Sequence, residues 1–173
     1  RIHILTPGFK TPNGCAFLFP LVVHRRMLAE HGYDVILHRA VQSSLLECDT
    51  LIIDSKFYRD KWANEASGVI EALMHFRQRV PQLIYCDTTD STGTLQVDVL
   101  PVVDCYAKAQ LMRDRSKYQT SHYGHRIYTN YYHQTDGVAD RDPGWSRPIS
   151  ESTHLEKLSV SWNSGLADYS SLG

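Results

Sequence analysis

Blocks of apolar residues recur along the first hundred positions, separated by segments in which apolar residues return at helical spacing. The apolar blocks predict strands at Arg1–Thr6, near Val35–Leu37, near Leu51–Ile53, at the stretch PQLIYCD ending at Asp87, and near Val102–Tyr106. These blocks are rich in Ile, Val and Leu and show little strict alternation, which is typical of parallel strands covered on both faces. The expected fold class is α/β, a three-layer Rossmann-like domain with a mostly parallel sheet and helices on both faces.

Helical spacing appears in three places between these blocks. A helix is predicted to begin near Ala16 or Phe17, with Pro20 in its first turn, and to end at His31-Gly32, where glycine can take the left-handed cap. A short helical piece is expected at 43–47. A long helix is expected from Asp60 to Val80, stopped by Pro81, with these candidate core residues: Trp62, Val69, Ile70, Leu73, Met74 and Phe76.

The pattern weakens after Lys108. Residues of about 109–155 are polar, aromatic and rich in turn formers, so an irregular region is predicted there. A last strand is expected at Leu158–Trp162, followed by an Asn-Ser-Gly turn. We expect residues 1–173 to form one domain, with the tail at 156–173 leading toward a further domain of a longer protein.

Composition narrows the functional classes. The chain has 173 residues, 42% of them hydrophobic, and a formal net charge of -1, which favours one globular domain and gives no electrostatic case for nucleic acid. The longest apolar run, AFLFPLVV, is too short to predict a membrane span, although peripheral association stays open. Four scattered cysteines without a CxxC pair favour a reducing, cytoplasmic location without structural disulfides.

The loop after the first strand, TPGFKTPNGC, is a candidate ligand loop. It lacks the GxGxxG spacing of dinucleotide sites, because Gly8 and Gly14 stand six apart, and Cys15 occupies the place where a phosphate-binding loop needs lysine. Two interpretations remain: a structural turn without a ligand, or a loop whose backbone lines a cleft for a hydroxyl-rich or anionic ligand.

A second candidate is the run Cys86-Asp87-Thr88-Thr89-Asp90 at the end of the fourth strand. Asp87 or Asp90 could act as a general base or bind sugar hydroxyls. Alternatively, at least one of these aspartates caps a helix, since Asp and Thr are frequent caps.

The remaining clusters favour plainer interpretations. His122, His125 and His133 lack a metal-binding spacing, so no metal site is predicted. The charges from Lys108 to Lys117 are typical of a solvated face, with contact to a phosphate as the alternative. Four tyrosines could stack on a sugar ring but more often serve packing: Tyr123, Tyr128, Tyr131 and Tyr132.

The opening of the chain resembles GT-B glycosyltransferases. The first strand ends in TPG, the loop closes on Gly14, and the helix carries RRMLAEHGYDV, similar to the family's pattern of a helix ending in Gly-His-x-Val. Tyr33 stands here in place of the histidine. The architecture resembles the family over about residues 1–108, and the motif over about the first forty.

The resemblance implies the amino-terminal, acceptor-side half of a two-domain transferase of polysaccharide biosynthesis. Asp87 or Asp90 would be catalytic, and the acceptor, a small molecule or a growing glycan, would contact the following residues: Gly8, Asn13, Gly14, Cys15, Thr88 and Lys108. It implies no cofactor in this half, because the carboxyl-terminal half would bind the nucleotide-sugar donor. Alone, the chain is then expected to be inactive. Donor, acceptor, stereochemistry and oligomeric state stay open.

Two alternatives belong to other functional classes. The chain could be a stand-alone Rossmann or flavodoxin-like domain that binds a nucleotide or flavin, which predicts tight binding of NAD, FMN or a nucleotide. It could also be a non-catalytic interaction module whose Tyr/His-rich segment, Gln119–Gln134, meets a protein partner.

Overall fold

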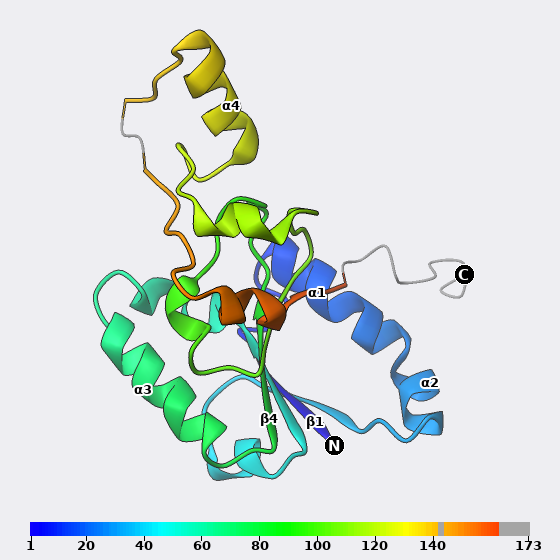
Figure 1. Ribbon diagram of the computed structural model, residues 1–173. Coiled ribbons are helices and arrows are strands. Elements are labelled where there is room, and N and C mark those ends of the chain that lie inside the picture. The colour runs from blue at the N-terminus through cyan, green and yellow to red at the C-terminus, as the bar shows by residue number, and fades with distance from the viewer. Residues whose placement is uncertain (142–143, 163–173) are drawn as a thin grey trace.

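A sheet of six parallel strands forms the centre of the computed structural model, which describes residues 1–141 and 144–162. The strand order is β2-β1-β3-β4-β5-β6. The strands are β1 Ile2–Leu5, β2 Val35–His38, β3 Thr50–Asp54, β4 Gln82–Asp87, β5 Cys105–Lys108 and β6 Leu158–Val160. Helices lie on both sides of the sheet (Figure 1), so the predicted α/β, Rossmann-like fold class is confirmed.

The α-helices are α1 Pro12–Val23, α2 Arg25–Glu30, α3 Ala66–Arg77 and α4 Ile127–Asp136. Five 3-10 segments accompany them: η1 Ser43–Leu46, η2 Ser55–Lys61, η3 Val97–Val99, η4 Arg115–Gln119 and η5 Ser152–Lys157. In Figure 1, α1 and α2 stand on one side of the sheet and α3 on the other. This arrangement agrees with right-handed crossovers that leave β1 and β3 in opposite directions along the sheet.

The larger core fills the face covered by α3. Leu51, Leu83 and Tyr106 point into it from the strands. Val69, Leu73 and Phe76 recur at helical spacing along α3 and are buried against them. The opposite face holds a smaller core in which Phe17 and Leu18 of α1 pack with Ile4, Ile52 and Cys86.

The first helix begins earlier than its hydrophobic pattern predicts. It starts at Pro12, because Thr11 is an N-cap whose side chain accepts a hydrogen bond from the backbone N–H of Gly14 at 3.1 Å. Pro20 therefore lies inside α1 and not in its first turn, which corrects the prediction. The helix breaks at His24 and α2 resumes at Arg25, and the predicted left-handed glycine at the end is confirmed, since Gly32 has a φ of 82°.

The predicted long helix at 60–80 is two elements. Residues 55–61 form the 3-10 segment η2, and α3 begins only at Ala66. Met74 was predicted in the core but is 48% exposed, because it lies on the solvent side of the stripe formed by Val69, Leu73 and Phe76. The helical piece predicted at 43–47 is the 3-10 segment η1, and β5 begins later than predicted, at Cys105.

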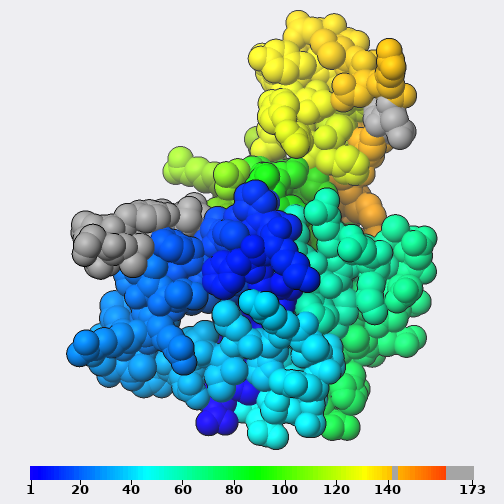
Figure 2. Space-filling view, turned by 180° about the vertical axis from the view of Figure 1, so that it is seen from behind, coloured from blue at the N-terminus to red at the C-terminus, as the bar shows by residue number. Residues whose placement is uncertain are grey.

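The region predicted to be irregular contains a helix. Helix α4 ends at Gly137, whose φ of 65° provides a left-handed cap. Figures 1 and 2 show this part of the chain as a lobe standing off the sheet. A small aromatic cluster supports it: the rings of Tyr123 and His133 stack with centroids 3.8 Å apart, and Trp145 meets Tyr123 edge-on.

The last strand predicted, at Leu158–Trp162, is present but ends earlier. Strand β6 covers Leu158–Val160 and pairs with β5, whereas the predicted Asn-Ser-Gly turn lies outside the described residues. In the described part of the chain, every helix is too short or too polar to cross a bilayer.

Candidate functional site

Four strands deliver polar side chains to one edge of the sheet. Because β1, β3, β4 and β5 are parallel, their carboxyl ends meet there, and Thr6, Asp54, Asp87 and Lys108 stand at those ends. Asp87 and Lys108 are register partners in neighbouring strands. In an open α/β sheet this edge is where ligands bind.

Asp87 and Lys108 form a buried ion pair. The Nζ of Lys108 lies 2.8 Å from Oδ2 of Asp87, and the side chains are 0% and 5% exposed. The same Oδ2 accepts the hydroxyl of Tyr106 at 2.6 Å, and Oδ1 accepts the backbone N–H and the hydroxyl of Thr89. The Nζ of Lys108 also donates to the carbonyl oxygen and the hydroxyl of Thr89. Both carboxylate oxygens of Asp87 and the ammonium group of Lys108 thus have hydrogen-bond partners within the protein.

Burial lowers the pKa of Lys108, and the attraction of Asp87 opposes that shift. Neither residue lies free to meet a ligand. Lys108 was predicted to bind the acceptor and Asp87 to be one of two catalytic candidates; the geometry gives both an internal partner, and the pair fixes the loop that follows β4.

Asp54 was missed by the sequence analysis. It is fully buried at the end of β3. Its Oδ2 accepts the hydroxyl of Thr6 at 2.8 Å, and its Oδ1 accepts the hydroxyl of Thr88 at 3.0 Å and the backbone N–H of Lys56. Burial raises the pKa of Asp54, and these hydrogen bonds partly offset the rise. The run LIID ends in a carboxylate just as LIYCD does, so the same strand-end pattern predicts both aspartates.

The helix-cap interpretation of the aspartates at 87 and 90 is wrong. No helix starts in this loop, since the next helical segment, η3, begins at Val97. Asp87 instead closes a turn within the loop, with its Oδ1 2.9 Å from the backbone nitrogen of Thr89.

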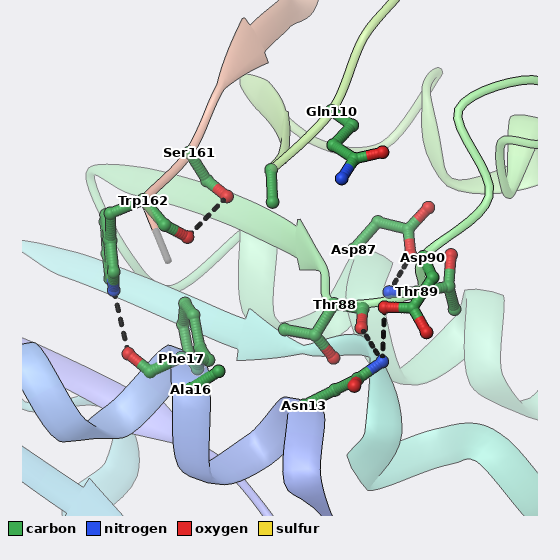
Figure 3. A pocket seen from close by; sticks show the side chains of 11 residues that line it. Asn13, Ala16, Phe17, Asp87, Thr88, Thr89, Asp90, Gln110, Ser161 and Trp162 are labelled. Carbon is green, nitrogen blue, oxygen red and sulfur yellow. Dashed lines mark hydrogen bonds between the residues drawn. The ribbon is translucent and has the colours of Figure 1, made fainter. Parts of the chain in front are cut away.

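Asp90 and Asn13 meet above the loop. Asp90 is exposed, and its Oδ1 accepts a hydrogen bond from Nδ2 of Asn13 at 2.9 Å, as Figure 3 shows. The same Nδ2 lies 2.9 Å from the carbonyl oxygen of Thr88. The first turn of α1 is thereby joined to the end of β4. Among residues 1–141 and 144–162, the second oxygen of Asp90 has no hydrogen-bond partner.

A cavity opens beside this contact. Its volume is about 130 Å³, and its wall includes Asn13, Thr88, Asp90, Gln110 and Trp162. One side is aromatic: the ring of Trp162 stacks on Phe17, with centroids 5.1 Å apart, and its Nε1 donates to the carbonyl oxygen of Phe17. Carboxylate, amide and hydroxyl groups beside an aromatic ring suit a ligand with many hydroxyl groups. Complete small-molecule sites span about 300–1,000 Å³, so this cavity is large enough for only part of one.

The glycine loop packs closely against the first turn of α1. Gly8 is buried with a φ of 82°, and a Cβ built on Gly14 would lie 3.0 Å from the carbonyl oxygen of Gly8. The Sγ of Cys15 donates to the carbonyl oxygen of Phe9. Of the residues predicted to contact the acceptor, Asn13 and Thr88 line the cavity, whereas Gly8, Gly14, Cys15 and Lys108 do not.

The other candidate clusters do not line this cavity. Tyr128, Tyr131 and Tyr132 are exposed on α4 and line a separate hollow of about 550 Å³ that shares Asp90 and Gln110 with the cavity. All four cysteines are free. Among residues 1–141 and 144–162, no three His, Cys, Asp or Glu side chains are placed to hold a metal ion together.

Comparisons with protein-family models, curated proteins and solved structures find no match to this chain.

Proposed function

We propose that this chain is the acceptor-side half of a glycosyltransferase, which moves a sugar from a nucleotide-sugar donor to a small-molecule or glycan acceptor. The observation that carries the proposal is the cavity at the carboxyl edge of the sheet, where Asn13 holds an exposed Asp90. Asp90 is the preferred catalytic residue, as the base that removes a proton from the attacking hydroxyl of the acceptor.

The local chemistry supports Asp90 over Asp87. A general base needs an oxygen within hydrogen-bond reach of the substrate. Both oxygens of Asp87 are occupied by Lys108, Tyr106 and Thr89, whereas Asp90 faces the cavity. Asp87 and Lys108 then act as the buried support of the loop that presents Asp90.

The small size of the cavity supports a site that is formed jointly with a second domain. At about 130 Å³ it accommodates a fragment of a sugar, and a second domain closing over the edge would complete it. Under the proposal, the donor binds mainly to that second domain, outside this chain.

A stand-alone nucleotide or flavin domain is the second candidate, favoured by one observation. β1 lies between β2 and β3, the strand order at which flavodoxin-like proteins bind FMN between the first and third strands. At that position here, however, the hydroxyl of Thr6 is bonded to the carboxylate of Asp54, and a carboxylate disfavours a phosphate group beside it.

The experiment compares two proteins: the 173-residue chain and the full natural gene product, each incubated with a panel of nucleotide sugars while release of the nucleotide is followed. The proposal predicts turnover by the gene product alone. Robust turnover by the 173-residue chain would contradict the division into halves. Tight binding of FMN or NAD by that chain would favour the second candidate.

A further inference from the structure

A second cavity lies on the other side of the loop that follows β4. Its volume is about 310 Å³, which reaches the range of small-molecule sites. One wall is η2, which supplies Lys56 and Arg59, and the opposite wall includes Thr94 and Gln96. Asp87 and Thr89 belong to the walls of both this cavity and the one beside Asp90.

Two cationic side chains that form no salt bridge within residues 1–141 and 144–162 line this space. Lys56 and Arg59 are three residues apart on a 3-10 segment, so their side chains lie on the same face. Within residues 1–141 and 144–162, neither side chain makes an ion pair or a hydrogen bond. Lys61 on the same segment is different, because its Nζ lies 3.6 Å from a carboxylate oxygen of Glu65.

The acidic groups near the cavity do not cancel the charge of its two cations. The only acidic residue in the described wall is Asp87, which is paired with Lys108. Asp54 lies behind Lys56, outside the cavity wall, and its carboxylate interacts with the charge of Lys56; it is one negative charge against the two cations of the wall. The cavity therefore offers net positive charge and an amide donor, that of Gln96, whose side chain makes no hydrogen bond within the described residues.

We propose that the cavity formed by η2 and Gln96 binds an oxyanion, a phosphate or carboxylate group carried by the acceptor. Arg59 offers the planar donor pair that matches such a group, and Lys56 adds a point charge. The assignment to an acceptor rests on the proposed function; anion binding itself does not. An acceptor anchored here would reach Asp90 past Asp87 and Thr89, since these two residues line both cavities.

The test is calorimetric titration of the 173-residue chain with inorganic pyrophosphate and, separately, with glucuronate, both at low ionic strength. The double variant Lys56→Gln/Arg59→Gln is expected to bind about tenfold or more weakly. The control Arg25→Gln/Lys61→Gln removes the same charge elsewhere and is expected to retain wild-type affinity. Circular dichroism verifies that all three proteins are folded, which is expected because Arg25, Arg59 and Lys61 are exposed and Lys56 is only half-buried.

The outcomes separate cleanly. Absence of wild-type binding to both pyrophosphate and glucuronate, or equal loss in both double variants, would overturn the inference. Tighter binding of pyrophosphate than of glucuronate indicates a phosphorylated acceptor, and the reverse order a carboxylated one. If the gene product transfers no sugar while pyrophosphate binding depends on Lys56 and Arg59, the proposed function fails and the oxyanion site stands.

Discussion

Lys108 and Asp87 are register partners on neighbouring strands, and their side chains form a buried ion pair of 2.8 Å. Removing one partner of a buried pair leaves the other charge uncompensated, which costs more than the pair contributes. The pair therefore has a structural role at the edge of the sheet where the candidate site lies.

Replacing Lys108 with methionine tests that role. We expect Lys108→Met to lower the free energy of unfolding by about 3–5 kcal/mol, and Lys108→Met/Asp87→Asn to recover part of the loss because no charge is stranded. Urea denaturation measures both, with Lys10→Met, at an exposed lysine, as the control. A loss no larger than that of the control would show that the pair does not stabilise the fold.

Gly8 provides a second test of the site's framework. Its φ of 82° lies in the left-handed region, and a Cβ there would meet the guanidinium of Arg39 at 3.2 Å. Gly8→Ala is expected to lower the free energy of unfolding by about 1–2 kcal/mol. Gly68→Ala is the matched control: it lies in α3 with nothing within 4 Å of the added Cβ, and it is expected to stabilise by about 0.5–1 kcal/mol. Equal effects in both variants would contradict the argument.

The buried ring of His38 predicts a pH dependence of stability. The rings of His3 and His38 lie 4.6 Å apart, and their Nε2 atoms have no hydrogen-bond partner among the described residues. Burial, and secondarily the proximity of His3, lowers the pKa of His38 from its ordinary 6.5. The unfolded chain then binds more protons than the folded one below that value. The stability contribution is present above pH 6.5 and is lost as the pH falls toward the folded pKa.

Urea denaturation between about pH 5 and 7.5 measures this dependence. We expect the free energy of unfolding to fall with pH in the wild type and to fall less steeply in His38→Gln. His75→Gln, which removes an exposed histidine on α3, is expected to keep the wild-type slope. A His38→Gln profile parallel to the wild type would rule out His38 as the cause.

Features determined by residues close together in the sequence can be predicted from it, whereas features that depend on residues far apart in the sequence cannot. The strand at Gln82–Asp87 and the glycine cap at Gly32 follow from local patterns, and both are confirmed. Helix α4 was not predicted, because none of its residues is buried and it therefore lacks the apolar stripe by which a helix is recognised.

Contacts between segments far apart in the sequence could not be predicted from it. The stacking of Trp162 on Phe17 joins positions 145 residues apart, and no local pattern encodes it. The pairing of Lys108 with Asp87 depends on the register of two strands, which a list of strand ends does not determine. The sequence therefore identifies which loops carry polar groups, but not which of those groups remain free for a ligand.

The most direct test of the central claim is steady-state sugar transfer by the full natural gene product carrying Asp90→Asn. We predict that kcat falls by about 100-fold or more, while thermal stability stays near the wild-type value because Asp90 is exposed. Asp60→Asn serves as the control. It removes an exposed carboxylate elsewhere, on η2, and is expected to leave kcat unchanged. Wild-type kcat in Asp90→Asn would contradict the assignment of this cavity as the place where the acceptor hydroxyl is activated.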